Sequence, residues 1–128
     1  MQISVNTKIT GVEKLVFFTS QTPQVKGIIA IHNTLRGPAL GGCRIYDYNT
    51  VTDGVNDAMT LAKAMTYKNT IVDLPFGGGK AVIYKNPHVT QNLILEAFAR
   101  VLNHLAGEYY TADDVGTSVT DMNYLRQY

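Results

Sequence analysis

Residues 74–84, Leu-Pro-Phe-Gly-Gly-Gly-Lys-Ala-Val-Ile-Tyr, are the stretch that decides the fold. The apolar segment from Lys80 to Tyr84 predicts a buried strand. Amphipathic helices are predicted on both sides of this segment, one before the glycines and one after Tyr84. Strands that alternate with helices indicate an α/β domain, in which helices cover both faces of a sheet.

The two flanking helices have clear start and stop signals. The first is predicted over about residues 52–68, because Thr50-Val51-Thr52-Asp53 has the form of a capping box. Its apolar face is Val55, Ala58, Met59, Ala62 and Met65. The second helix opens near Thr90 and stops at Gly107. Its apolar stripe is Leu93, Ile94, Ala97, Phe98, Val101, Leu102 and Leu105.

The rest of the chain continues the same pattern. Further strands are predicted over residues 3–5, 15–18, 26–32, 42–46 and 109–111. A second capping box, residues 118–121, opens a last helix. We therefore expect one three-layer α/β/α domain over residues 1–128, with a largely parallel, mixed sheet. Because the chain stops within the last helical pattern, we expect a fragment of a longer protein.

Composition excludes several classes of protein. The 128 residues are 45% hydrophobic and 16% charged, which argues against disorder, and the net charge of +1 argues against nucleic-acid binding. No apolar run reaches the roughly 18 residues that a membrane span needs. The first four residues lack the layout of a signal peptide, so we expect a cytoplasmic protein. One cysteine and three scattered histidines give no metal-ligand spacing, so no metal is expected.

Two glycine-rich stretches, residues 37–42 and 74–80, lie beside predicted strand ends. Open α/β sheets bind ligands at strand ends, and glycine lets the backbone approach a ligand closely. Tight turns are the alternative interpretation. Neither stretch has a known nucleotide signature, because Ala81 replaces the Ser or Thr of a phosphate loop and Val82 replaces the third glycine of a dinucleotide fingerprint.

Three charged residues suggest chemistry. Lys68 ends the first helix, Lys80 enters a buried strand, and Asp114 follows the strand at residues 109–111. Burying an ammonium is costly unless it is paired or neutral. Two lysines and a carboxylate around one cleft would suit an anionic substrate and proton transfer. Surface lysines and a helix-capping aspartate are the alternative.

Five blocks of residues occur together in one order and spacing. They are Ile31-His32-Asn33-Thr34, Gly37-Pro38-Ala39-Leu40-Gly41-Gly42, Met65-Thr66-Tyr67-Lys68-Asn69, Gly77-Gly78-Gly79-Lys80 and Thr111-Ala112-Asp113-Asp114-Val115-Gly116-Thr117. The chain resembles the N-terminal domain of the amino-acid dehydrogenase superfamily, which comprises the glutamate, leucine, phenylalanine and valine dehydrogenases. It is most similar to the leucine dehydrogenase branch, and the resemblance covers nearly the whole chain.

The resemblance implies roles for individual residues. Lys68 resembles the lysine that binds the substrate α-carboxylate, Lys80 the catalytic lysine, and Asp114 the aspartate that exchanges protons with the substrate nitrogen. A second ammonium nearby, together with burial, is expected to lower the pKa of Lys80 so that it acts as a base.

The resemblance also implies a substrate pocket. Leu40 falls where glutamate-specific members have a lysine, so Leu40 and Met65 imply an apolar substrate side chain. Gly41 falls where the backbone runs close to the substrate. The glycines 77–79 are candidates to line the cleft, whereas the NAD is expected to bind mainly to a second, dinucleotide-binding domain that is absent from this chain.

The implied function is the reversible, NAD-dependent oxidative deamination of a branched-chain L-amino acid, of the leucine type, to the 2-oxo acid and ammonia. Valine or phenylalanine dehydrogenase is the alternative enzyme, and a non-catalytic module that binds amino acids or oligomerises is the alternative of another class. We expect the fragment alone to be inactive. We also expect a homo-oligomer, because Val16-Phe17-Phe18 offers an apolar surface.

Overall fold

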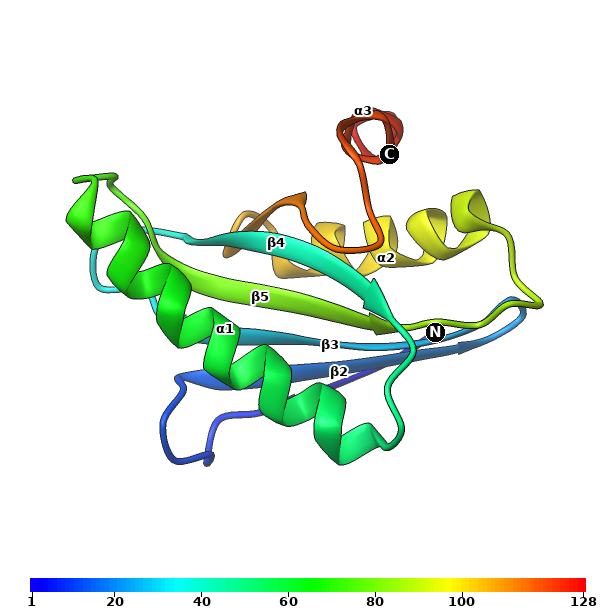
Figure 1. The fold of residues 1–128 in the computed structure, drawn as a ribbon, viewed down its shortest axis with the longest axis horizontal. Coiled ribbons are helices and arrows are strands. Elements are labelled where there is room, and N and C mark those ends of the chain that lie inside the picture. Colours follow the sequence, from blue (N-terminus) through cyan, green and yellow to red (C-terminus); the bar gives the residue numbers. More distant parts are fainter.

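A mixed six-stranded sheet forms the centre of the computed structural model, which describes residues 1–128 (Figure 1). The strand order is β1-β2-β3-β5-β4-β6. The strands are β1 (Gln2–Asn6), β2 (Lys14–Gln21), β3 (Gln24–Asn33), β4 (Ala39–Tyr46), β5 (Gly77–Tyr84) and β6 (Tyr109–Asp113). The helices are α1 (Val51–Ile71), α2 (Gln91–Leu105) and α3 (Val119–Leu125).

The direction of each strand follows from the length of its connections. Strands β1, β2, β3 and β5 pair in antiparallel fashion, whereas β4 pairs in parallel with both β5 and β6. A short turn between strands permits only antiparallel pairing, and a parallel pair needs a helical crossover. The predicted α/β class and mixed sheet are confirmed, although the parallel part is limited to β4, β5 and β6.

The helices form two layers, and each layer covers one face of the sheet. Figure 1 shows α1 across the near face, with α2 and α3 on the other side. The larger apolar core lies between the sheet and α2, and includes Phe18, Ile29 and Phe98. A smaller core lies under α1, around Ile28, Ala58 and Val82. No helix is both long enough and apolar enough to cross a bilayer.

The glycine-rich stretches are mostly strand, not turn. Strand β4 already begins at Ala39 and β5 at Gly77, so the glycines open these strands. A Cβ at Gly77 would overlap the carbonyl oxygen of Asn33, and one at Gly78 would overlap the backbone of Thr66 in α1. The missing side chains therefore let β3 and α1 lie directly against β5. The glycines lie at or near the amino ends of β4 and β5, which run parallel to each other.

The apolar run in β2 is part of the core. Val16 and Phe18 are fully buried in the larger core, and Phe17 is half-buried against the smaller one. The expected surface patch at these residues is therefore wrong, because β2 lies between β1 and β3 and has packing partners on both faces. Strand β1, whose residues are exposed except for Ile3, forms the outer edge of the sheet.

Candidate active site

Lys80 and Asp114 form a buried ion pair. Lys80 lies in the middle of β5 with 5% of its surface exposed, and its Nζ lies 2.8 Å from Oδ2 of Asp114. Strands β5 and β6 are not neighbours, because β4 lies between them. Cys43 in β4 pairs with Ala81 on one side and with Asp113 on the other. The register therefore aligns Lys80 with the end of β6, and the pair predicted to share one cleft is in direct contact.

Gly42 makes this contact possible. Alternate residues of a strand face opposite sides of the sheet, and because Cys43 and Ala81 belong to the core beneath α2, Gly42 and Lys80 face the α1 side. A Cβ at Gly42 would lie 2.8 Å from Cβ of Asp114 and 3.1 Å from Nζ of Lys80. The lysine side chain therefore crosses β4 at the one position on the α1 face of this strand that has no side chain.

Arg44 extends the pair into a network. Its Nε donates to Oδ2 of Asp114 at 2.9 Å, and its Nη1 donates to Oδ2 of Asp57 in α1 at 3.1 Å. The hydroxyl of Tyr48 donates to the same oxygen of Asp57. Sequence reasoning missed these three residues. The available signal was Arg44 itself, an arginine two positions after Gly42 in an otherwise apolar strand.

The network sets the charges of its members. Burial works against the ionisation of Asp114, but the hydrogen bonds from Lys80 and Arg44 outweigh it and hold the pKa of Asp114 below its ordinary value. Burial also opposes the charge on Arg44, but the hydrogen bond to Asp114 raises the pKa of that guanidinium. Asp114 is thus a carboxylate held between two cations.

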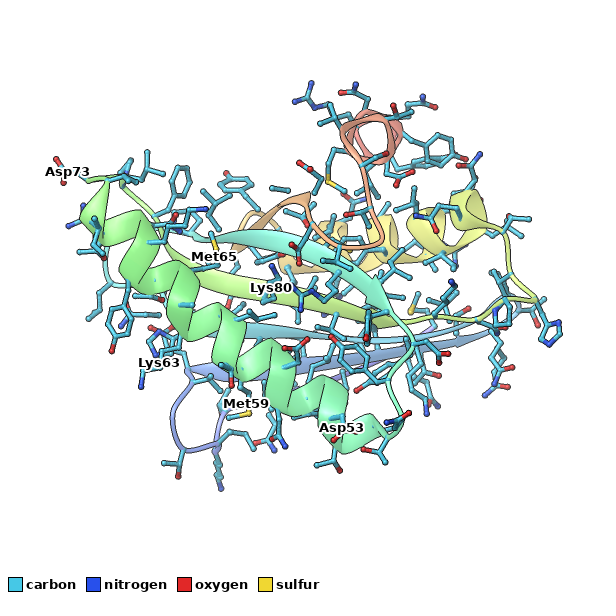
Figure 2. All side chains as sticks on the ribbon, in the orientation of Figure 1. Asp53, Met59, Lys63, Met65, Asp73 and Lys80 are labelled. Atoms are coloured by element: carbon cyan, nitrogen blue, oxygen red, sulfur yellow. The ribbon has the colours of Figure 1, made fainter.

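The expected substrate-binding residues lie around the last turns of α1. Lys68 is exposed there, and Met65 is half-buried one turn earlier. Figure 2 shows Met65 on the flank of α1 that faces β4, with Lys80 farther along the same side of the sheet. The side chain of Asn69 fixes this end of α1, because Nδ2 donates to the carbonyl oxygens of Leu40 at 3.3 Å and Gly77 at 2.8 Å. No hydrogen bond or ion pair joins Lys68 to the Lys80–Asp114 pair.

The backbone around Gly41 is held from β6. The buried hydroxyl of Tyr109 donates to the carbonyl oxygens of Gly41 at 2.9 Å and Gly42 at 3.0 Å. Burial raises the pKa of this tyrosine, so it stays a neutral donor. The segment at which the resemblance implies close approach to the substrate is therefore rigid.

The glycines 77–79 offer no cradle for a cofactor. All three are buried in β5, and the space that a Cβ would occupy is filled by Asn33, Thr66 and Tyr109 respectively. Their missing side chains make room for the protein itself. The residues in this strand therefore do not fit a bound dinucleotide.

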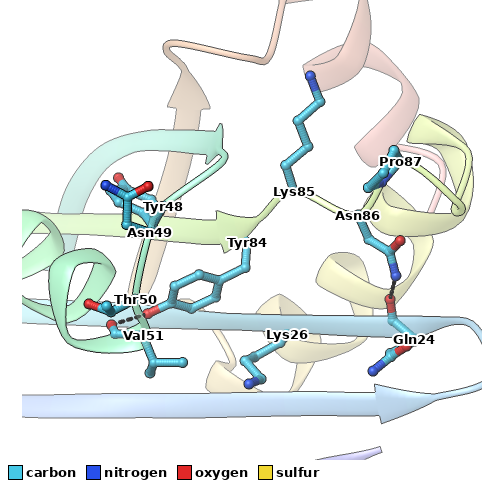
Figure 3. A pocket seen from close by; sticks show the side chains of 10 residues that line it. All are labelled: Gln24, Lys26, Tyr48, Asn49, Thr50, Val51, Tyr84, Lys85, Asn86 and Pro87. Carbon is cyan, nitrogen blue, oxygen red and sulfur yellow. Dashed lines mark hydrogen bonds between the residues drawn. The ribbon is translucent and has the colours of Figure 1, made fainter.

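A hollow lies beside the N-terminal end of α1. It has a volume of about 300 Å³ and is lined by ten residues, among them Lys26 and Lys85 (Figure 3). The side chain of Tyr84 extends across this hollow, and its hydroxyl donates to the carbonyl oxygen of Val51 at 2.6 Å. Neither Lys80 nor Asp114 contributes to its lining. This hollow is therefore separate from the candidate active site.

Two further residues have structural roles. Cys43 is fully buried, and burial raises the pKa of its thiol. The Nδ1 of His32 is hydrogen-bonded to Oγ1 of Thr66 at 2.8 Å, and burial lowers the pKa of the imidazole.

The fold and the sequence together are those of the dimerisation domain of the amino-acid dehydrogenases. Residues 14–128 match the family model described as Glu/Leu/Phe/Val dehydrogenase, dimerisation domain. The chain belongs to this family, whose members are oxidoreductases. The resemblance stated from the five blocks of sequence is thereby confirmed.

Individual relatives are similar at comparable levels. The chain is 45% identical over 116 residues to the leucine dehydrogenase of Geobacillus stearothermophilus, covering 90% of this chain and 32% of that protein. It is 45% identical over 114 residues to the valine dehydrogenase of Streptomyces virginiae, covering 88% and 32%. The crystal structure of L-tryptophan dehydrogenase from Nostoc punctiforme superposes with a TM-score of 0.87 and 39% identity, covering 91% and 35%. The chain spans about a third of the length of these relatives.

Proposed function

We propose that this chain is the N-terminal substrate-binding and oligomerisation domain of an NAD-dependent amino-acid dehydrogenase. The observation that carries the proposal is the buried Lys80–Asp114 pair at 2.8 Å, in a chain that belongs to a dehydrogenase family. The reaction is the reversible oxidative deamination of an L-amino acid to the 2-oxo acid and ammonia.

The substrate is a branched-chain amino acid of the leucine type. Leu40 and Met65 present apolar side chains near the end of α1, and no cation replaces Leu40 to bind a side-chain carboxylate. Valine is the second candidate, because a valine dehydrogenase is as similar to this chain as a leucine dehydrogenase is, and phenylalanine is a third.

Each charged residue has one task in this proposal. Lys68 binds the substrate carboxylate as a point charge. A nicotinamide, when bound, would supply the acceptor for the hydride of the substrate Cα. Lys80 first passes its proton to Asp114 and then, as a neutral amine, takes a proton from the water that adds to the resulting imino carbon. Asp114 delivers its proton to the substrate nitrogen as ammonia leaves. The 2.8 Å hydrogen bond between Lys80 and Asp114 lets a proton pass from one to the other.

The cofactor and the assembly complete the proposal. The NAD binds mainly to a second, dinucleotide-binding domain, because the glycines of this chain are filled by protein neighbours. Residues 1–128 alone therefore have no activity. The family description as a dimerisation domain and the open edge at β1 support a homo-oligomer, which we place in the cytoplasm as part of this proposal.

The experiment compares three lysine variants of the full-length enzyme with leucine, valine and phenylalanine. We expect Lys68→Ala to raise KM more than it lowers kcat, because its charge meets the carboxylate before and during the reaction. We expect Lys80→Ala to lower kcat by roughly 10²- to 10⁴-fold, the usual effect of losing a general base. Lys63→Ala, another exposed lysine of α1, is the control and should change neither constant.

The same measurements can reject the proposal. A near-normal kcat in Lys80→Ala together with lost turnover in Lys68→Ala would reverse the two roles. Turnover of none of the amino acids by the full-length protein, with binding retained, would instead identify a non-catalytic amino-acid-binding module. The ratio of kcat/KM among the three amino acids decides the substrate.

A further inference from the structure

Arg44 links the candidate active site to helix α1. Its guanidinium binds two carboxylates at once, Asp114 at 2.9 Å through Nε and Asp57 at 3.1 Å through Nη1. Asp57 comes from α1, Arg44 from β4, and Asp114 from the segment that follows β6. One side chain thus ties together three elements that are distant in sequence.

The contact with Asp114 is specific in its geometry. Lys80 and Arg44 both bind Oδ2 of Asp114, so neither cation occupies Oδ1. A planar guanidinium fixes the orientation of a carboxylate far better than an ammonium, whose donors rotate. Arg44 therefore restricts the orientation of the Asp114 carboxylate, and no cation of the protein binds Oδ1.

Arg44 is itself held in place. Asp57 binds the far side of the guanidinium, and the hydroxyl of Tyr48 donates to the same oxygen of Asp57. The side chain of Arg44 is about one-fifth exposed, so little water competes for these bonds. A charged pair at this depth gains more from fixed geometry than an exposed pair does.

We propose that Arg44 is a positioning residue, which orients the Asp114 carboxylate for proton exchange through Oδ1, with Asp57 as its anchor. This inference rests on the proposed function in one respect only: the proton is exchanged with the nitrogen of an amino-acid substrate. The geometric part, that Arg44 controls the state and orientation of Asp114, stands on the contacts themselves.

The groups around Asp114 determine its pKa, which a titration against pH measures. Lys80 from β5 and Arg44 from β4 bind it directly, and the backbone of Val115 also favours its ionised form. The thiol of Cys43 and the hydroxyl of Tyr109 are close to it but belong to the core on the other face of the sheet. Asp57 acts through Arg44. Without Arg44, only Lys80 and the backbone of Val115 oppose the effect of burial, so the pKa of Asp114 moves up toward its ordinary value or beyond.

The test combines a direct titration with kinetics of the full-length enzyme. Aspartate carboxyl carbons are labelled with ¹³C and titrated by NMR, and Asp114→Asn assigns the resonance. We expect Arg44→Met, which keeps much of the side-chain stem, to raise the titration midpoint of the Asp114 carboxyl. We expect kcat to fall by roughly 10- to 100-fold, as small misplacements of catalytic groups do, with little change in KM.

Two further variants separate position from charge. Arg44→Lys keeps a cation, so the Asp114 midpoint should stay low, but one ammonium cannot bridge both carboxylates and kcat should remain reduced. Asp57→Asn keeps the Arg44–Asp114 bond and loosens only its anchor, so kcat should fall less than in Arg44→Met. Arg36→Met, which breaks the exposed Arg36–Asp73 pair, is the matched control and should alter neither readout.

The outcomes distinguish the two proposals. An unchanged Asp114 midpoint and an unchanged kcat in Arg44→Met would overturn the inference, as would wild-type kcat in Arg44→Lys. If Arg44→Met does not fold, Asp57→Asn decides, and wild-type kcat there overturns the anchoring role. A protein without dehydrogenase activity whose Asp114 midpoint still moves in Arg44→Met would overturn the proposed function but not the control of Asp114 by Arg44.

Discussion

The absence of one side chain decides whether Lys80 can reach Asp114. The lysine comes from β5 and the aspartate follows β6, so the side chain of Lys80 must cross β4. It crosses at Gly42, where a Cβ would meet both partners. At this position the glycine serves a neighbouring side chain rather than an unusual backbone angle.

We predict that Gly42→Ala impairs catalysis more than it impairs folding. The added Cβ would lie 2.8 Å from Cβ of Asp114, so the pair must shift by a few tenths of an ångström or separate. Shifts of this kind cost up to about 100-fold in rate. Steady-state kcat of the full-length enzyme, with circular dichroism to monitor folding, measures the effect. Normal kcat in a folded variant would contradict the role of Gly42.

A substitution at a glycine far from the site shows the effect of backbone strain alone. Gly11 has a φ of +97° and no atom within 4 Å of an added Cβ. Gly11→Ala should therefore lower the free energy of unfolding by about 1–2 kcal/mol, the cost of a left-handed residue that has a side chain, and leave kcat unchanged.

The buried carboxylate also predicts a pH dependence of stability. The pKa of Asp114 is lower in the folded protein than its ordinary value of 3.8. Its ionised form therefore stabilises the fold above about pH 4, and this contribution disappears as the pH falls through the lowered pKa. We expect Asp114→Asn to lower the free energy of unfolding at pH 7 by about 1–3 kcal/mol, a typical value for hydrogen bonds to charged groups.

Urea unfolding at a series of pH values between 7 and 3 measures this difference. The gap between the wild type and Asp114→Asn should narrow as the pH falls below 4. Asp113→Asn, a change at the exposed neighbour that has no ion pair, is the control and should give a small difference at every pH. If the difference in unfolding free energy between the wild type and Asp114→Asn instead widens as the pH falls, the predicted pH dependence is contradicted.

At the scale of elements, local patterns predicted where helices and strands lie but not how far they extend. The helix predicted over 52–68 runs from Val51 to Ile71, and the predicted capping residue Thr50 accepts a hydrogen bond from the backbone of Asp53. The strand predicted from Lys80 begins at Gly77. Glycine has low intrinsic preference for strands, so only tertiary packing against β3, α1 and the Tyr109 side chain of β6 explains these three glycines.

The candidate site was predictable in part for a related reason. Lys80 and Asp114 stood out by residue type beside strand ends, and the resemblance gave them roles. Arg44 and Asp57 did not, because their partners depend on β4 lying between β5 and β6. Strand order is a property of the whole sheet, and no local periodicity contains it.

The buried face of α2 differs in part from the face that the sequence predicted. The apolar stripe predicted Leu93 in the core, yet Leu93 is 42% exposed and Leu95 is fully buried. The first turn of α2 therefore faces the sheet with a different flank from the predicted one. We expect Leu95→Ala to cost about 2–5 kcal/mol of unfolding free energy through the cavity it leaves.

Leu93→Ala is the matched variant on the same helix. An exposed position away from any special contact usually changes stability by less than about 0.5 kcal/mol. Thermal and urea unfolding of both variants measure the pair. Equal losses for Leu93→Ala and Leu95→Ala would contradict the burial of α2 described above.

At the scale of the whole molecule, the sheet has two outer edges, β1 and β6. An unpaired edge strand offers a row of backbone donors and acceptors to another chain. Strand β6 pairs with β4 beside Leu40, in the region that we propose binds the substrate. Its edge must therefore stay accessible, whereas β1 lies at the other end of the sheet.

We therefore predict that the protein self-associates through the β1 edge. The two edges offer matched positions, because Val5 in β1 is 47% exposed and Tyr110 in β6 is 48% exposed. Val5→Lys places a charge on the β1 edge, which natural edge strands use to prevent pairing, and should shift the protein from a dimer or larger assembly toward monomer. Tyr110→Lys should leave the assembly unchanged. Sedimentation velocity at tens of micromolar, a concentration at which interfaces of ordinary size often associate, measures both variants. A wild type that is monomeric there would refute self-association, and dissociation by Tyr110→Lys alone would move the interface to β6.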